Sequence, residues 1–314
     1  MSMRVPLRST RRPLSTSDDL YDRVAQEAAA TVIRNYSTSF GLACRLLGQP
    51  VRDRVRNVYA LVRLADEVVD GPLGVHDPAR AGVLLDRLEH DTAEAVRDGY
   101  STNLVVHAFA LTARACDIED DLIAPFFASM RADLTVREHD AASFDGYVYG
   151  SAEVVGLMCL RIFVADGASA AGASAAGAIQ EAGRRQRDYD DLAPGARRLG
   201  AAFQKINFLR DLADDHQRRG RCYFPAVDPD HLTEDDKSRI LDDIDADLVV
   251  AAAAARDLPH SSRRAVASAQ AMFTQLAVRL RATPAAAIRQ ERVRVPAATK
   301  ARIALTTVIR DGRS

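Results

Sequence analysis

The segment NVYALVRLADEVVDG at residues 57–71 indicates a helix with two different faces. Apolar residues recur along it at helical spacing and predict a buried stripe. A second set of side chains, spaced four, three and four residues apart, shares one face and consists of Tyr59, Arg63, Asp66 and Asp70. Like charges four residues apart destabilise a helix by roughly 0.2–0.5 kcal/mol. We therefore expect arginine, solvent or a cation to offset the repulsion between Asp66 and Asp70.

A second segment, FQKINFLRDLADDH at residues 203–216, repeats this arrangement. The side chains that share its polar face, spaced three, four and four residues apart, are Gln204, Asn207, Asp211 and Asp215. One such acidic pair is ordinarily a solvated helix face, but two matched pairs favour a cation site. An all-oxygen ligand set suits Mg²⁺, which typically shares a few carboxylates with substrate phosphates. Arg63 and Arg210 precede the pairs, and guanidinium groups match phosphate oxygens, so we expect a Mg²⁺-bridged diphosphate.

Composition limits the classes of protein to consider. The chain has 314 residues, 47% of them hydrophobic and 27% charged, as in ordinary soluble globular proteins. Its net charge is −1, so no overall field favours nucleic acid, which is not an expected partner. No uninterrupted apolar run approaches the ~18 residues of a membrane span, and no GxxxxGKS/T loop occurs. The cysteines, which are too scattered for a zinc site or a disulfide framework and favour a cytoplasmic location, are Cys44, Cys116, Cys159 and Cys222.

The chain is expected to be helical almost throughout. Residues 1–18 are rich in Arg, Ser and Thr, lack the apolar core of a secretory signal, and are expected to form a disordered arm. No window shows strand alternation and no linker divides the rest, so residues 19–314 are expected to form one large all-α domain. The expected helices cover residues 17–36, 52–70, 78–97, 104–115, 120–134, 144–165, 177–189, 196–215, 236–256, 261–282 and 296–309.

Five segments resemble the squalene/phytoene synthase family, the head-to-head branch of the all-helical isoprenoid synthases. They are YSTSFGLACRLL (36–47), VYALVRLADEVVD (58–70), YVYGSAEVVGLMCLRIF (147–163), LGAAFQKINFLRDLADDHQRRGRCYFP (199–225) and ERVRVPAATK (291–300). They occur in the family's order, and the sequence is most similar to bacterial members of carotenoid pathways. The resemblance implies an all-α fold of the isoprenoid synthase type with a central cavity.

The resemblance also implies roles for individual residues. The ligands of Mg²⁺, or of Mn²⁺ in its place, would be Asp66, Glu67, Asp70, Asn207, Asp211 and Asp215. Contacts to the diphosphate would come from Tyr59, Arg63, Arg210 and Arg292, and catalysis would rest on these aspartates together with Tyr59, Arg63 and Arg210. Gln204 would line the substrate cleft, Ser37, Ser39 and Phe40 its entrance loop, and Tyr223 the site of the second step. Met272 and Phe273 occupy the region of a family tyrosine, so no hydroxyl is expected to act there.

The implied reaction joins two polyprenyl diphosphates head to head. We expect two geranylgeranyl diphosphates to condense 1–1′ through a cyclopropyl diphosphate to phytoene, in carotenoid biosynthesis and without NADPH. A squalene or dehydrosqualene synthase acting on farnesyl diphosphate is the alternative, and only squalene formation would need NADPH. A catalytically silent relative that binds lipid or a partner protein would be expected to lose carboxylates from one motif, whereas this chain keeps all four aspartates.

The reaction needs apolar walls that keep water away from a carbocation. Helix 147–163 offers Val154, Val155, Gly156, Leu157, Leu160 and Phe163 as candidates. Glycine costs about 1 kcal/mol in a helix interior relative to alanine, and close approach of a polyprenyl chain would be one reason to tolerate Gly156. Because the product is very hydrophobic, we expect this cytoplasmic protein, a monomer or homodimer, to contact the membrane peripherally. The Arg-rich stretches 4–12 and 289–302 would then lie near anionic lipid.

Overall fold

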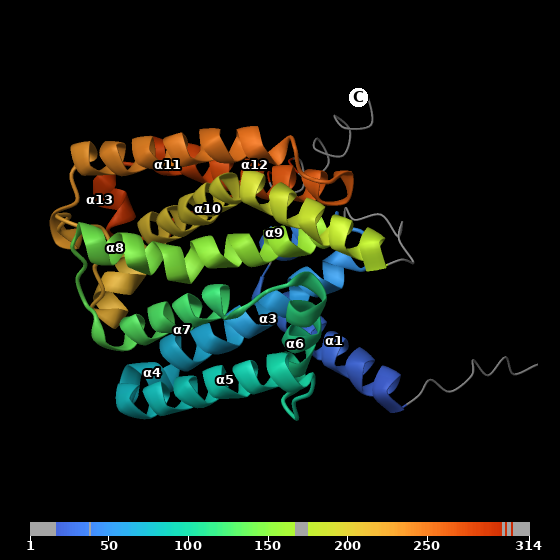
Figure 1. The fold of residues 1–314 in the computed structure, drawn as a ribbon. Coiled ribbons are helices and arrows are strands. Elements are labelled where there is room, and N and C mark those ends of the chain that lie inside the picture. The colour runs from blue at the N-terminus through green and yellow to red at the C-terminus, as the bar shows by residue number, and fades with distance from the viewer. Residues whose placement is uncertain (1–16, 38, 167–174, 297–298, 300–302, 304–314) are drawn as a thin grey trace, which may run out of the picture.

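The computed structural model describes residues 17–37, 39–166, 175–296, 299 and 303. Helices dominate this part of the chain, and its one β-type contact is an isolated bridge between Glu138 and Cys222. The all-α prediction is therefore confirmed (Figure 1). Residues 1–16 of the predicted arm and most of the helix predicted at 296–309 lie outside the described residues.

Several helices begin at a side-chain cap that the local sequence provides. Asn103 accepts hydrogen bonds from two backbone N–H groups at the start of one helix, and Thr233 and Asp236 form a capping box at the start of another. In chain order the elements are α1 (Ser17–Tyr36), α2 (Ser39–Cys44), α3 (Val51–Asp70), α4 (Pro72–His76), α5 (Pro78–Asp98), α6 (Leu104–Cys116), α7 (Asp120–Thr135), α8 (Ala141–Val148), the π-helix η1 (Tyr149–Glu153), α9 (Val154–Asp166), α10 (Ala175–Arg219), the 3-10 helix η2 (Pro229–His231), α11 (Glu234–Ala255), α12 (His260–Ala282) and α13 (Ala285–Ile288).

The prediction of two helices at 177–189 and 196–215 is wrong, because α10 runs unbroken for 45 residues with Pro194 inside it. A proline removes the hydrogen bond to the carbonyl four residues earlier. Pro194 and Asp190, which carries that carbonyl, are both exposed, so water can satisfy the carbonyl oxygen. Gly195 on the next position is buried, and a Cβ there would lie 2.1 Å from Cβ of Ala254 on α11. Close packing against α11 therefore keeps α10 continuous where local sequence favours a break.

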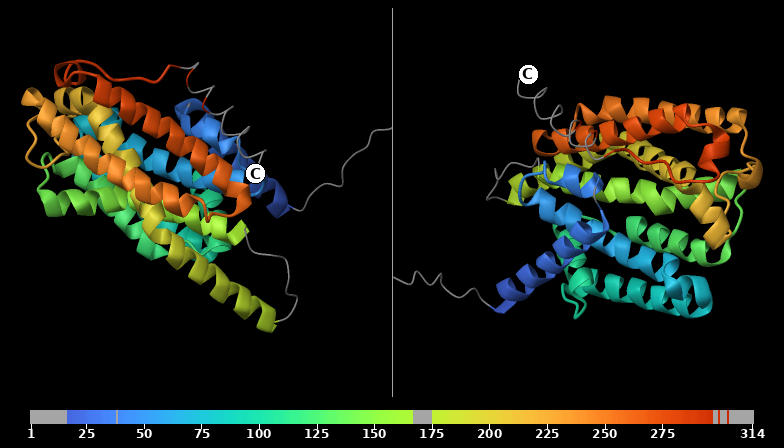
Figure 2. Two further views of the ribbon diagram at one scale, coloured as in Figure 1. Left: turned by 90° about the horizontal axis from the view of Figure 1, so that it is seen from above. Right: turned by 180° about the vertical axis from the view of Figure 1, so that it is seen from behind.

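The helices are arranged in layers around α3 and α10. In Figure 1, α11 and α12 lie above α10 and α9, while α3, α7 and α5 lie below; Figure 2 shows the same order from behind. α3 packs against α1, α6 and α9, and α10 packs against α9, α11 and α12. One large buried cluster surrounds α3, and another lies between α10 and α11. The helices that carry the two acidic stripes thus belong to adjoining cores.

The run from α8 through η1 to α9 is a single apolar rod with a π-helical turn. It covers Ala141–Asp166 and is long and apolar enough to cross a membrane by length and composition, with 61% of its most apolar window buried inside the fold. Such burial is typical of the core helix of a globular protein. This segment contains no long uninterrupted apolar run, because isolated polar residues divide it in the sequence.

Candidate active site

The C-terminal ends of α3 and α10 lie close together, and arginines link them. Nη1 of Arg221, which follows α10, donates to Oδ1 of Asp70 on α3 at 2.7 Å. Nη1 of Arg219 donates to Oδ1 of Asp215 at 2.6 Å, and its Nε lies 3.7 Å from Oδ1 of Asp70. The structure therefore brings the two acidic stripes together, and arginine side chains offset their repulsion.

Asp211, the first aspartate of the second stripe, contacts two guanidinium groups. Nε of Arg210 donates to its Oδ1 at 2.8 Å, and Nε of Arg292 lies 2.7 Å from the same oxygen. Desolvation and the neighbouring charge of Arg210 lower the pKa of Arg292. Two positive charges therefore share one carboxylate, an arrangement that can accept a further anion.

Asp66 lies in a crowded acidic region of α3. Nη2 of Arg63 donates to Oε2 of Glu67 at 2.6 Å, whereas its Nη1 is 3.9 Å from Oδ2 of Asp66. Desolvation by the surrounding protein and the charge of Asp70 raise the pKa of Asp66 to about 7. Because 35% of the Asp66 side chain remains exposed, its burial is only partial. A cation beside these carboxylates would reverse the shift.

A buried polar cluster lies behind Asp70. Asp133 on α7 accepts hydrogen bonds from the hydroxyls of Tyr147, at 2.7 Å, and Tyr223, at 3.2 Å. Nη1 of Arg221 lies 3.7 Å from Asp133 and donates to the Tyr223 hydroxyl at 3.2 Å. Burial raises the pKa of Asp133 to about 6 and raises the pKa of both tyrosines. The predicted residue Tyr223 is thus held firmly beside the acidic ends of the two helices.

Sequence reasoning missed Asp133, Arg219 and Arg221. Arg221 lies inside the GRCYFP continuation that supported the family resemblance, and this position was the available signal. Its side chain is only 6% exposed and bridges Asp70 and Asp133. Asp133 has no comparable signal, because a single acid in an amphipathic helix is usually solvated. Its burial follows from the packing of α7 against α3 and α8.

The predicted entrance loop lies beside α3. The ring of Phe40 stacks on that of Tyr59, with centroids 5.5 Å apart. The backbone N–H of Phe40 donates to Oγ of Ser37 at 3.2 Å, which fixes the start of α2. Ser39 begins α2, and its side chain lies outside the described part. The structure therefore brings Ser37 and Phe40 to the Tyr59 side of the cleft.

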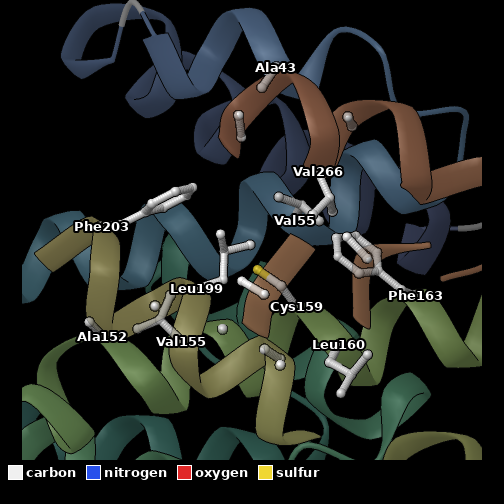
Figure 3. Close-up of a pocket in the computed structure, with 18 of the residues that line it drawn as sticks. Ala43, Val55, Ala152, Val155, Cys159, Leu160, Phe163, Leu199, Phe203 and Val266 are labelled. Carbon is white, nitrogen blue, oxygen red and sulfur yellow. The ribbon is translucent and has the colours of Figure 1, made fainter. Parts of the chain in front are cut away.

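An apolar cavity of about 240 Å³ lies between α2, α3 and the helices from α9 to α12 (Figure 3). Its wall is almost wholly apolar, apart from Ser151, Gln204 and two cysteine thiols. Nε2 of Gln204 donates to Oγ of Ser151 at 3.3 Å. Gln204 lies seven residues before Asp211, two helical turns along the same face of α10. The predicted central cavity is confirmed, and its polar end faces the acidic stripes.

The wall prediction is partly correct. Val155, Gly156, Leu160 and Phe163 line the cavity, but Val154 and Leu157 do not; they are buried in the surrounding core.

Gly156 is explained by the packing of two helices, and the expected close approach of a polyprenyl chain is not needed to explain it. A Cβ at this position would lie 2.6 Å from the carbonyl oxygen of Ala196 on α10. Gly200 on α10 repeats the contact in reverse, since its Cβ would lie 2.5 Å from the carbonyl oxygen of Ala152. The close approach of two helices therefore requires glycine at both positions, without any appeal to a substrate.

The donors predicted to hold a metal fit a hard divalent cation. They are the carboxylates of Asp66, Glu67, Asp70, Asp211 and Asp215 and the amide of Asn207, all oxygen ligands. Desolvation raises the pKa of Asp215 to about 6, and the charge of Asp211 adds to the shift while Arg219 opposes it. Among the residues that the structure describes, no three acidic, histidine or cysteine side chains form a ready-made metal cluster. The side chains would have to exchange some arginine contacts for the cation.

An all-helical bundle with an apolar cavity that ends at two acidic stripes defines an isoprenoid-synthase-type fold. Solved structures agree: a dehydrosqualene synthase aligns with a TM-score of 0.67 at 17% identity over 94% of this chain and 99% of its own. The squalene synthase of Alicyclobacillus acidocaldarius aligns with a TM-score of 0.67 at 18% identity over 84% of this chain and 95% of its own. The model of the squalene/phytoene synthase family matches residues 33–299, and the chain belongs to this family.

Curated relatives lie within the same family. The chain is 31% identical over 206 residues to phytoene synthase 3 of Zea mays, covering 65% of this chain and 43% of that protein. It is 31% identical over 202 residues to the 15-cis-phytoene synthase of a Paracoccus species, covering 60% of this chain and 56% of that protein. These two matches therefore span about half of each relative. The phytoene synthase of Mycobacterium bovis matches over 304 residues at 29% identity, covering 90% of this chain and 88% of that protein.

Proposed function

We propose that this protein is a phytoene synthase that joins two geranylgeranyl diphosphates head to head and releases diphosphate. One observation carries the proposal: the apolar cavity ends at Gln204, and the Asp211 carboxylate with its two arginines lies two helical turns further along α10. A molecule with a long apolar tail and an anionic head matches both parts. The choice of the C20 donor rests on relatives named phytoene synthases, one of which aligns along 88% of its length.

Mg²⁺, or Mn²⁺ in its place, would be held by oxygens of Asp66, Asp70, Asn207, Asp211 and Asp215, with Glu67 nearby. When bound, it would neutralise the diphosphate as the C1–O bond breaks. Arg63, Arg210 and Arg292 would bind the remaining phosphate oxygens and hold the leaving group in place. We infer that the anion replaces part of the present pairing of Asp211 with its two arginines.

The apolar cavity protects the allylic cation from water. The C2–C3 double bond of the second donor attacks C1 of this cation, and loss of a proton closes a cyclopropane that still carries its own diphosphate. A second C–O cleavage and rearrangement, followed by loss of another proton, gives the 1–1′ linked product. The proton acceptor is diphosphate or a cleft tyrosine. The raised pKa values of Tyr223 and Tyr147 disfavour their phenolates, which favours diphosphate in this role.

A synthase that uses farnesyl diphosphate is the second candidate, and the solved dehydrosqualene and squalene synthases of like fold motivate it. The test is to incubate the pure protein with Mg²⁺ and each diphosphate separately, with and without NADPH, and to measure the mass and absorption spectrum of the product. We expect a C40 triene-conjugated hydrocarbon from the C20 donor and no need for NADPH. A C30 product from farnesyl diphosphate, with none from the C20 donor, would refute the proposal.

A further inference from the structure

The side chains that line the apolar cavity differ in size from one part of its wall to another. Along α11 and α12 the wall consists largely of alanine, such as Ala251, Ala255, Ala265 and Ala269. Bulky side chains line the other helices, with Leu199 and Phe203 of α10 beside Gln204 and with Phe163 of α9 and Leu192 of α10 farther from it. Small residues leave space for a chain, whereas bulky residues close it. The distribution therefore suggests a channel with a blocked end.

The glycine contacts set the register of α9 against α10. Position 200 on α10 meets position 152, and position 156 on α9 meets position 196, so the two helices run antiparallel in matched turns. Continuing by one turn places Leu160 level with Leu192. Leu192 is the first residue of α10 in the cavity wall, and Phe163 is the last residue of α9. Both helices therefore leave the wall at the same level.

This level is the end remote from the acidic stripes. Gln204 and Leu192 are 12 residues apart on α10, which corresponds to about 18 Å of helix at the usual rise per residue. Figure 3 shows Phe203, next to Gln204, and Phe163 on opposite sides of the pocket, with Leu199, Val155 and Cys159 between them. Phe163 is 8% exposed and belongs to the same buried cluster as Leu192 and Leu258. Its ring is the largest side chain at the blocked end.

We propose that Phe163 is the end wall that limits the length of the prenyl chain, touching the tail farthest from the diphosphate. The inference rests on the proposed function only in taking a prenyl diphosphate as the donor, and it holds for a C15 or a C20 preference. A rigid aromatic ring in a close-packed core cannot yield to an extra five-carbon unit without loss of packing. Removing ring volume should therefore lengthen the accepted chain.

The test compares the wild type with Phe163→Leu in a competition of equimolar C15, C20 and C25 diphosphates with Mg²⁺, followed by mass analysis of the products. Calorimetric titration with the unreactive thiolodiphosphates of the same three lengths gives a binding ratio that needs no turnover. We expect the ratio for the longer over the preferred donor to rise by about tenfold or more, the scale on which a hydrophobic pocket discriminates a single methylene. Phe109→Leu is the matched control, since Phe109 is buried in the same cluster but does not line the cavity.

Thermal melting first establishes that each variant is folded, and Phe163→Met, which removes a similar volume but has a flexible side chain that adapts to irregular gaps, replaces the leucine variant if that one is not. An unchanged donor ratio in a folded variant overturns the proposal, as does an equal change in the Phe109→Leu control. A wild type that prefers the C15 donor refutes the phytoene synthase assignment but leaves the end wall testable, by the C20 to C15 ratio. A wild type that turns over no donor refutes the proposed function, and the binding ratio then decides on Phe163 separately.

Discussion

Nη1 of Arg221 donates a hydrogen bond to Oδ1 of Asp70 at 2.7 Å, across 151 positions of the chain. This contact ties the segment after α10 to the last residue of α3, so the two acidic helices are held at one end of the bundle. The same guanidinium reaches Asp133 and the hydroxyl of Tyr223. A single buried arginine therefore organises three groups that belong to three different segments.

Arg221→Ala should destabilise the fold severely. The change leaves Asp70 and Asp133 without their shared cation, and breaking a buried ion pair typically costs about 3–5 kcal/mol. The free energy of unfolding from urea titration measures the loss. Arg218→Ala is the matched control, because the Arg218 side chain is 79% exposed and its ion pair with Asp214, at 3.5 Å, lies at the surface. This change should alter the free energy of unfolding by no more than about 0.5 kcal/mol. Equal stability of the two variants would contradict the role assigned to Arg221.

Asp66→Asn should reduce turnover strongly while stabilising the metal-free protein above pH 7. The folded pKa of Asp66 is raised, to about 7, so the ionised carboxylate opposes folding above that pH. This opposition is relieved as the pH falls through the folded pKa toward the unfolded one. Melting temperatures in EDTA at pH 6 and pH 8 check the sign. The melting temperature of the variant should exceed that of the wild type at pH 8, and the difference should be smaller at pH 6. A destabilised variant at pH 8 would show that the Asp66 charge is already well compensated.

Mg²⁺ with inorganic diphosphate should raise the melting temperature of the wild type, because a ligand that binds only the folded state stabilises it. At a ligand concentration of about 100 times Kd, binding raises the free energy of unfolding by about 2.7 kcal/mol. Asp211→Asn should abolish most of this shift. Asp214→Asn, a neighbouring acid with 42% of its side chain exposed, should keep it. EDTA should remove activity, and added Mg²⁺ should restore it; activity that survives EDTA would exclude the metal-dependent mechanism.

Gly156→Ala should destabilise the protein by about 1–3 kcal/mol, as overpacking of a close-packed core does. The new methyl group would meet the Ala196 carbonyl oxygen at 2.6 Å. Gly146→Ala on α8 is the control, since nothing lies within 4 Å of a Cβ there. It should be neutral or stabilise the helix by up to about 1 kcal/mol. Chemical denaturation of both variants measures the difference, and a stable Gly156→Ala would show that α9 and α10 can move apart.

Local periodicity was sufficient to predict most helices, because the apolar residues on the buried face of an amphipathic helix recur at helical spacing in its own sequence. The helices at 52–70, 104–115 and 120–134 agree with α3, α6 and α7 within a residue or two. The same spacing identified the two acidic faces, since residues four apart on one helix must be neighbours wherever that helix lies. The break predicted within α10 failed because Pro194 is a local signal that packing against α11 overrides.

Contacts between distant segments had no such local record. The burial of Asp133 and the reach of Arg221 to Asp70 depend on how α7 and the segment after α10 meet α3, and the contact of Arg292 with Asp211 depends on how the C-terminal segment meets α10. The requirement for glycine at position 156 likewise comes from the neighbouring helix and not from its own sequence. Side-chain spacing along one helix is set by covalent geometry, whereas partners between helices are selected by the packing of the whole core, so the sequence pattern predicted the acidic faces and the fold alone assembled them into a site.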